Sequence, residues 1–127
     1  MIASKRVLIV DDDSEIVTGM RLRLEAAGYN TSTAGDGQEC LESAVADPPD
    51  AIVLDVRMPR LDGLSTLERL RMVDRTRHVP VVMLSASLAD QRAALDAGAR
   101  FFLSKPYQGS KLIEAVNCVI DDFETQT

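Results

Sequence analysis

The stretch Val7-Leu8-Ile9-Val10-Asp11-Asp12-Asp13 joins a short apolar run directly to three carboxylates. Asp55 ends a second apolar run, and Lys105 follows a third. Because the carboxyl ends of parallel strands meet at one edge of a sheet, we expect these charged side chains to lie together. Crowded carboxylates resist ionisation unless a hard cation or a cationic side chain lies among them. The pattern therefore predicts a magnesium site with a lysine beside it.

The apolar runs are continuous rather than alternating, which is typical of strands covered on both faces of a sheet. They occupy residues 7–10, 51–54, 79–84 and 101–103, and a weaker run at 29–34 indicates an edge strand.

Apolar residues at helical spacing lie between these runs. In chain order they are Ile16, Val17, Met20, Leu24 and Ala27 before Gly28; Leu41, Ala44 and Val45 before Pro48 and Pro49; Leu64, Leu67 and Leu70; and Leu112, Ile113, Val116, Val119 and Ile120 within about residues 110–123. A further helix is predicted from Ser87 and Asp90, which have the spacing of a capping box, to the terminating Gly98.

Five strands alternating with five helices predict an α/β fold with right-handed crossovers and an open parallel sheet covered by helices on both faces. The length of 127 residues fits one domain, residues 1–127, with an ordered core over about residues 5–123. Ligand sites of such sheets lie at the carboxyl ends of the strands. Asp11, Asp55, Ser85 and Lys105 all fall at that edge.

Composition narrows the class of protein. Twenty acidic against fourteen basic residues give a net charge of -6, which argues against direct binding of nucleic acid. No apolar run is long enough for a membrane span or a signal peptide, so we predict a cytoplasmic protein without a membrane partner. Cys40 and Cys118 show no metal or disulfide pattern, and both are predicted to be buried small hydrophobes. The only histidine, His78, lies in a predicted loop away from the acidic edge.

Four motifs follow one another at the predicted strand ends. They are Val10-Asp11-Asp12, Leu54-Asp55-Val56-Arg57-Met58-Pro59 with Asp62-Gly63, Leu84-Ser85-Ala86, and Ser104-Lys105-Pro106. On these motifs the chain resembles the receiver domain of two-component response regulators, of the CheY-like superfamily, over essentially its whole length. The resemblance implies a flavodoxin-like, doubly wound sheet with strand order 2-1-3-4-5.

The resemblance also implies a role for each residue at the acidic edge. Asp55 would be the phosphoacceptor, whose carboxylate attacks a phosphohistidine and becomes an acyl phosphate. Asp11, Asp12 and Asp55 would bind Mg2+ together with the backbone carbonyl of Arg57. Because Mg2+ takes six oxygen ligands and usually keeps waters, this set leaves room for a phosphoryl oxygen.

Lys105 would pair with Asp55 before phosphorylation and with a phosphoryl oxygen afterwards, and the family commonly has a cis peptide bond before the following proline, here Pro106. Asp13 we interpret instead as a helix N-terminal residue, favoured there by the helix dipole.

A switch is implied as well. The hydroxyl of Ser85 would donate to the phosphoryl group, and the ring of Phe102 would turn into the vacated space and change the surface of the fourth helix, fifth strand and fifth helix. The alternative for Phe102 is an ordinary buried ring, and Phe101 should face the other side of the sheet. The resemblance further implies that the positions of Arg57 and Ser87 influence the lifetime of the acyl phosphate. Whether Arg57 screens the site, clamps the phosphoryl group or points into solvent stays open.

The predicted function is that of a phosphorelay signalling module rather than an enzyme, although it assists its own phosphorylation and dephosphorylation. Its partners would be a histidine kinase or a histidine phosphotransfer protein and a downstream protein; a phosphorylation-dependent dimer stays open. One alternative is a phosphohydrolase of the haloacid dehalogenase type, with Asp11 as nucleophile and Asp13 as acid/base. That motif usually has Thr or Val where this chain has Glu15, and Asp55 would have no role in it. The other alternative is a degenerate receiver that acts as a docking scaffold.

Overall fold

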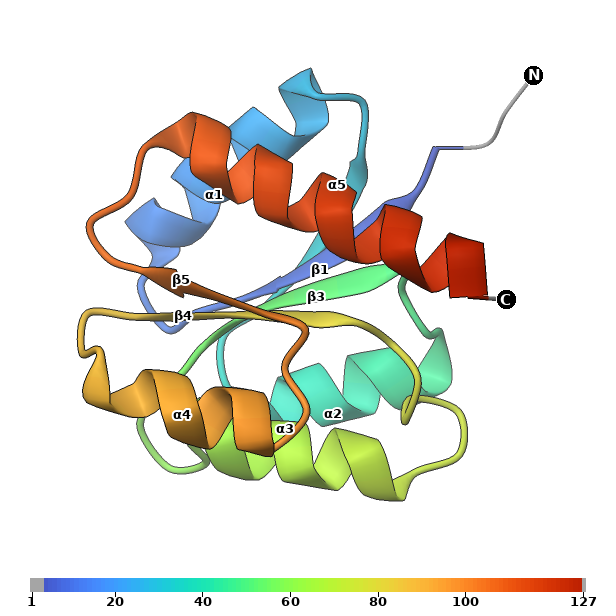
Figure 1. Ribbon diagram of the computed structural model, residues 1–127, viewed down its shortest axis with the longest axis vertical. Coiled ribbons are helices and arrows are strands. Elements are labelled where there is room, and N and C mark those ends of the chain that lie inside the picture. The colour runs from blue at the N-terminus through green and yellow to red at the C-terminus, as the bar shows by residue number, and fades with distance from the viewer. Residues whose placement is uncertain (1–3, 127) are drawn as a thin grey trace.

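The apolar runs form the strands of a single sheet. The computed structural model describes residues 4–126, along which strands and helices alternate (Figure 1). The strands are β1 Arg6–Val10, β2 Asn30–Ala34, β3 Ala51–Asp55, β4 Val81–Ser85 and β5 Phe101–Ser104. The helices are α1 Ser14–Ala26, α2 Gly37–Ala46, α3 Gly63–Met72, α4 Ala89–Asp96 and α5 Gly109–Gln126. The predicted alternation of strands and helices is confirmed.

All neighbouring strands are parallel, in the order β2-β1-β3-β4-β5. β1 lies next to one edge of the sheet; the chain adds β2 outside it, and then crosses back over β1 to add β3, β4 and β5 on the other side. The prediction of β2 as an edge strand is confirmed. The fold is therefore the doubly wound, flavodoxin-like α/β sheet that the resemblance implies.

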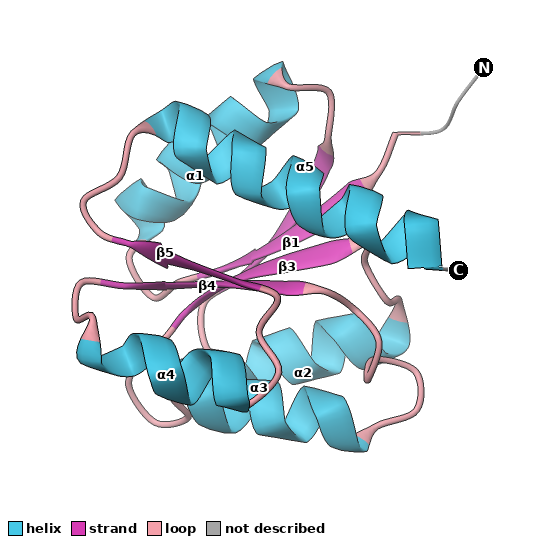
Figure 2. Ribbon diagram, in the orientation of Figure 1, coloured by secondary structure: helices cyan, strands magenta, loops and turns pink. Residues whose placement is uncertain are grey.

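Helices cover both faces of the sheet (Figure 2). On one face, α1 and α5 contribute Met20, Leu24, Leu112 and Val116 to a core with the alternate residues of β1, β3 and β4. On the other face, α2, α3 and α4 pack over a second core that includes Leu67, Leu70 and Ala94. This division explains the continuous apolar runs, because each interior strand buries side chains in both cores.

The start of α1 matches the prediction for Asp13. Its carboxylate accepts hydrogen bonds from the backbone N–H groups of Glu15 and Ile16, at 3.0 and 3.3 Å, and so caps the helix. The helix stops before Gly28, whose φ of 101° is a left-handed conformation that glycine adopts without strain. Ile16, however, shares the helical spacing of the apolar residues in this segment and is nevertheless 39% exposed. Helical spacing identifies a shared face, but not where that face runs past the edge of the sheet.

The predicted capping box at α4 is wrong. Leu88 occupies the N-cap position and makes no side-chain hydrogen bond to the helix. The Ser87 hydroxyl accepts a bond from the Ala89 N–H at 3.3 Å, but the Asp90 carboxylate does not turn back to Ser87. It turns instead toward β4 and the loop that follows β3, where charged and hydroxyl partners lie.

Two further predictions about the second half of the chain need correction. Cys40 is buried, and burial raises the pKa of its thiol to about 12, but Cys118 lies exposed on α5. The helix α5 continues to Gln126, beyond the predicted end near residue 123. Among the helices that the structure describes, none is long and apolar enough to cross a membrane.

Arg71 joins three segments at the end of the molecule opposite the acidic residues. From the end of α3, its guanidinium donates to the backbone carbonyls of Thr76, Arg77 and Val79, at 3.4, 3.1 and 2.8 Å. It also donates to the carbonyl of Gly98, directly after α4, at 3.0 Å. Burial lowers the pKa of Arg71. The loop before β4 and the turn after α4 are thus tied to one side chain.

Candidate functional site

Three carboxylates converge at the carboxyl edge of the sheet. Asp11 follows β1 and Asp55 ends β3, and these strands pair in register with Val10 opposite Leu54. One oxygen from each of Asp11, Asp12 and Asp55 lies within 4.8 Å of the others. Asp11 and Asp55 are buried, at 3% and 6% exposure, whereas Asp12 faces solvent. The predicted meeting of the strand-end aspartates is confirmed.

Asp11 has one oxygen that the described residues leave unsatisfied. Its Oδ1 accepts a hydrogen bond from the Asp13 backbone N–H at 3.0 Å. Its Oδ2 is buried and has no hydrogen-bond partner among residues 4–126; the nearest cation is the Lys105 ammonium at 3.7 Å. A buried carboxylate oxygen without a donor is costly. A cluster of carboxylate oxygens from Asp11, Asp12 and Asp55 fits a hard divalent cation, which prefers oxygen ligands.

The electrostatics of the cluster favour binding of a cation. Burial raises the pKa of Asp11 and of Asp55, and the neighbouring carboxylates add to this effect. Lys105 opposes it at both residues. For Lys105 itself, burial acts to lower the pKa, but the charges of Asp55 and Asp11 together outweigh burial, so its pKa is raised. The lysine stays charged, and the cluster still carries excess negative charge.

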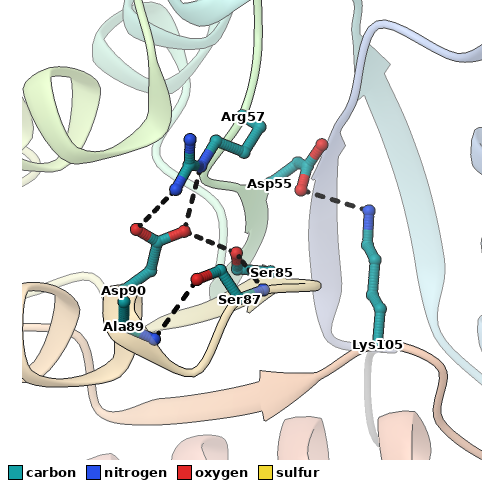
Figure 3. Close-up of polar contacts among 7 residues, drawn as sticks. All are labelled: Asp55, Arg57, Ser85, Ser87, Ala89, Asp90 and Lys105. Atoms are coloured by element: carbon teal, nitrogen blue, oxygen red, sulfur yellow. Dashed lines mark hydrogen bonds and ion pairs between the residues drawn. The ribbon is translucent and has the colours of Figure 1, made fainter.

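Lys105 comes from the end of β5 and reaches across to β3. Its Nζ lies 3.1 Å from Asp55 Oδ1, a direct hydrogen-bonded ion pair (Figure 3). Its backbone N–H donates to the Ser85 carbonyl at 2.8 Å, which fixes the start of the side chain beside β4. The Lys105–Pro106 peptide bond is cis, as the resemblance implies.

Ser85 and Arg57 meet at a third residue, Asp90 of α4 (Figure 3). The Ser85 hydroxyl donates to Asp90 Oδ2 at 2.6 Å. The Arg57 guanidinium donates to both oxygens of the same carboxylate, from Nε and Nη2, each at 3.1 Å. The Ser87 backbone N–H donates to the Ser85 hydroxyl oxygen at 3.1 Å. The sequence left open whether Arg57 screens the site, clamps the phosphoryl group or points into solvent. In the structure its side chain is 70% exposed, but its guanidinium pairs with Asp90.

Comparison with known proteins decides the family. The family model described as "Response regulator receiver domain" matches residues 7–117. This chain belongs to that family. It is a receiver domain of the two-component response regulators, and the phosphohydrolase alternative finds no support in the comparisons.

Curated relatives of this receiver are longer proteins. The "Transcriptional regulatory protein PrrA" of Mycobacterium tuberculosis is 44% identical over 121 residues, which cover 94% of this chain and 51% of the relative. The "Response regulator MprA" of Mycobacterium ulcerans is 40% identical over 119 residues, covering 92% and 50%. The receiver thus spans about half the length of the curated relatives that it matches.

Solved receivers have the same fold. The chemotaxis protein CheY4 of Vibrio cholerae superposes with a TM-score of 0.86 at 32% identity, covering 92% of this chain and 99% of that one. The receiver domain of the sensor histidine kinase PA1611 from Pseudomonas aeruginosa gives 0.87 at 30% identity, covering 94% and 99%. That structure holds a magnesium ion in its active-site cleft.

The acidic cluster of this receiver is open to solvent on two sides. A cleft of about 330 Å³ lies beside Asp11 and Asp12, between α1 and the end of β2. A second opening of about 400 Å³ is lined by Lys105 and by Ala86, Ile16, Pro106 and Tyr107. Ala86 is small and exposed. The exposed position of Ile16, which the helical pattern did not predict, places an apolar side chain at this entrance.

Asp90 is the residue of this receiver that sequence reasoning missed. Its spacing from Ser87 favoured a local capping role, whereas its strongest partner, Arg57, lies 33 positions away in the chain. The Arg57 hydrogen bond, followed by that of Ser85, lowers the pKa of the Asp90 carboxyl. The one signal in the sequence was Arg57, a long cationic side chain in the loop after β3. It indicates a carboxylate partner but does not identify the residue that provides it.

The aromatic residues of β5 lie on opposite faces, as predicted. Phe101 packs against the core under α1 and α5, whereas Phe102 packs, partly buried, against the core that includes α4. Tyr107 is half-buried. His78 is exposed in the loop before β4, at the other end of the strand from the acidic cluster.

Proposed function

We propose that this receiver domain, residues 1–127, accepts a phosphoryl group on Asp55 from the phosphohistidine of a histidine kinase or a histidine phosphotransfer protein. The observation that carries the proposal is the position of Asp55. Its carboxylate lies 3.1 Å from the Lys105 ammonium and clusters with the oxygens of Asp11 and Asp12. A nucleophilic carboxylate beside a mobile cation and a metal-binding cluster suits phosphoryl transfer, where catalysis is mostly positioning and electrostatics.

The covalent step is an exchange of one phosphorus bond for another. An oxygen of Asp55 attacks the phosphorus, the bond from phosphorus to the histidine nitrogen breaks, and the nitrogen keeps the bonding electrons. The product is an acyl phosphate on Asp55. Attack of water on the same phosphorus then releases inorganic phosphate and restores the carboxylate, which resets the module.

Asp11, Asp12, Asp55 and the backbone carbonyl of Arg57 would hold Mg2+. The donor set is all oxygen, which suits a hard cation, and Asp11 also carries the unsatisfied Oδ2. When bound, the ion neutralises charge that develops on the phosphoryl oxygens. Lys105, a flexible point charge, exchanges Asp55 for a phosphoryl oxygen.

Ser85 and Phe102 support a switch at the surface of α4, β5 and α5. Ser85 ends β4 beside Asp55, and Phe102 lies on the neighbouring strand opposite Met83. When the Ser85 hydroxyl turns toward a phosphoryl oxygen, the ring of Phe102 follows into the space beneath. Phosphorylation shifts the population toward the surface that binds the phosphate preferentially. This surface would meet a downstream protein or a second copy of the chain in the cytoplasm. Arg57 and Ser87 would set the phosphate lifetime.

Intact-mass spectrometry after incubation with acetyl phosphate and Mg2+ tests the proposal. We expect the mass of one phosphoryl group on the native protein, no addition without Mg2+, and none on Asp55→Asn. Asp74→Asn, which changes an exposed carboxylate in the turn after α3, is the matched control and should be labelled like the native protein.

The negative outcomes lead to different functions. If neither acetyl phosphate nor beryllofluoride acts on the native protein, the domain is a docking scaffold. If the protein instead turns over an aryl phosphate many times, with Asp11 rather than Asp55 required, the phosphohydrolase alternative returns.

A further inference from the structure

The hydroxyl of Ser85 is already committed in this structure. A serine hydroxyl has one hydrogen to donate, and that of Ser85 goes to Asp90 Oδ2 at 2.6 Å, a buried and charge-assisted bond. Ser85 itself is 1% exposed, so water does not compete for the bond. The same hydrogen cannot also be donated to a phosphoryl oxygen on Asp55.

Arg57 fixes the acceptor of this bond. Its guanidinium binds both oxygens of Asp90 in a bidentate pair, a geometry that sets both position and orientation of a carboxylate. Arg57 stands two residues after Asp55, and its own backbone carbonyl is the proposed ligand of Mg2+. The Asp90 carboxylate is therefore held between the phosphorylation loop and the end of β4 (Figure 3).

A purely structural role for Asp90 in α4 does not account for these contacts. Leu88 is the N-cap of α4 and makes no side-chain bond, and both oxygens of Asp90 point to Ser85 and Arg57. The exposed pair Arg92–Asp96 on the same helix shows the ordinary alternative, an ion pair within the helix.

We propose that Asp90, oriented by Arg57, is a positioning residue that holds the Ser85 hydroxyl in the resting state and competes with the phosphoryl group for it. This inference rests on the proposed phosphoacceptor function. When Ser85 donates to the phosphoryl group, the Asp90 carboxylate at the start of α4 loses its bond to β4 and keeps its pair with Arg57. The state of Asp55 thereby reaches α4 through one hydrogen bond.

The test measures binding of beryllofluoride, a phosphoryl mimic, in the presence of Mg2+. Without Asp90 the hydroxyl is free to donate, so Asp90→Ala should bind the probe about tenfold more tightly, the size expected from one charge-assisted hydrogen bond. In a Ser85→Ala background the same change should have no effect, because the hydroxyl that Asp90 acts on is absent. Asp96→Ala is the matched control on α4 and should bind like the native protein.

Two outcomes overturn the proposal. Equal affinity of Asp90→Ala and the native protein would show that no competition exists. Tightening that persists in the Ser85→Ala background would show that the freed Arg57, not Ser85, binds the probe. Asp90→Asn keeps the shape and an acceptor oxygen but not the charge, and it covers the case in which Asp90→Ala fails to fold. Its affinity for beryllofluoride should lie between those of the native protein and Asp90→Ala.

A second measurement separates this inference from the proposed function. The Ser87 backbone N–H donates to the Ser85 hydroxyl oxygen, so its NMR signal reports where that oxygen lies. In metal-free protein, Asp90→Ala should move the Ser87 signal in the direction in which beryllofluoride moves it in the native protein. An unmoved signal would overturn the resting bond. A native protein that fails to bind the probe would instead overturn the phosphoacceptor function and the competition together, while the Ser87 signal still tests the resting bond.

Discussion

The Lys105 ammonium lies 3.1 Å from Asp55 Oδ1, and the two residues come from strands that are not neighbours in the sheet. The lysine reaches over the end of β4 and, within the described cluster, is the only cationic side chain that pairs with Asp55 or Asp11. Its charge therefore offsets the repulsion between the carboxylates of Asp11 and Asp55, which a bound metal ion would also offset.

Removal of Lys105 should destabilise the metal-free protein more than the metal-bound protein. For Lys105→Ala with EDTA, we expect the free energy of unfolding to fall by about 1–2 kcal/mol, because two buried carboxylates lose their counter-charge. With saturating Mg2+ the loss should be clearly smaller. Urea denaturation measures both values, and Lys111→Ala, an exposed partner of Glu114, is the control. An equal loss in both conditions would contradict the argument.

Replacement of Asp11 should stabilise the metal-free protein. The pKa of Asp11 is raised in the folded state, chiefly by burial, so the stability contributed by its proton is full below the ordinary value of 3.8 and is lost as pH rises through the raised value. At neutral pH the ionised carboxylate is a net cost. Asp11→Asn should then raise the free energy of unfolding by on the order of 1 kcal/mol.

The pH dependence and the metal provide the checks on this prediction. The advantage of Asp11→Asn, measured with EDTA, should shrink as the pH falls toward 3.8. The variant should also lose most of the stabilisation that Mg2+ gives to the native protein, since it lacks one charged ligand. A variant that is less stable than the native protein at pH 7 with EDTA would refute the prediction.

Gly63 should not tolerate a side chain. At the first position of α3, its Cα packs against the backbone of β3, and an added Cβ would meet the carbonyl oxygen of Asp55 and the Cα of Val56. Neither is a flexible side-chain end, so the strand must shift. We expect Gly63→Ala to lower the free energy of unfolding by about 2–3 kcal/mol.

A second glycine makes the comparison internal. Gly19 lies within α1, and an added Cβ there meets nothing within 4 Å. Gly19→Ala should therefore raise the free energy of unfolding by about 0.5–1 kcal/mol, the gain in helix propensity. Denaturation of the two variants side by side checks both signs; a similar change in both would show that the β3 contact does not matter.

The proposed movement of Phe102 can be followed by fluorescence, because the chain contains no tryptophan. In Phe102→Trp the new indole should change its emission when beryllofluoride and Mg2+ are added, as its surroundings change. Phe101→Trp, on the opposite face of the same strand, should change little. If both respond equally, or neither does, the ring at position 102 is an ordinary core residue.

The sequence predicted the fold and the acidic cluster because both depend on patterns that act locally. An apolar run that ends in Asp11 or Asp55 determines which edge the carboxylate occupies, whatever the rest of the chain does. The position of Asp90 could not be predicted, because its partners come from β4 and from the loop after β3, and only the packing of α4 brings them together. The exposure of Ile16 and of Cys118 could not be predicted for a related reason: helical spacing does not show where a helix extends past the sheet that it covers.

Arg71 gives α4 a fixed end. Its bond to the Gly98 carbonyl ties the turn after α4 to α3 and to the loop before β4. The other end of α4 is held by contacts of a different kind, those of Asp90 with Ser85 and Arg57. If the contacts of Asp90 change while the bond at Gly98 stays, we expect α4 to pivot about its carboxyl end, with the largest displacement at its amino-terminal turn. There Leu88 is 67% exposed, so we expect this apolar side chain to report the movement to a partner.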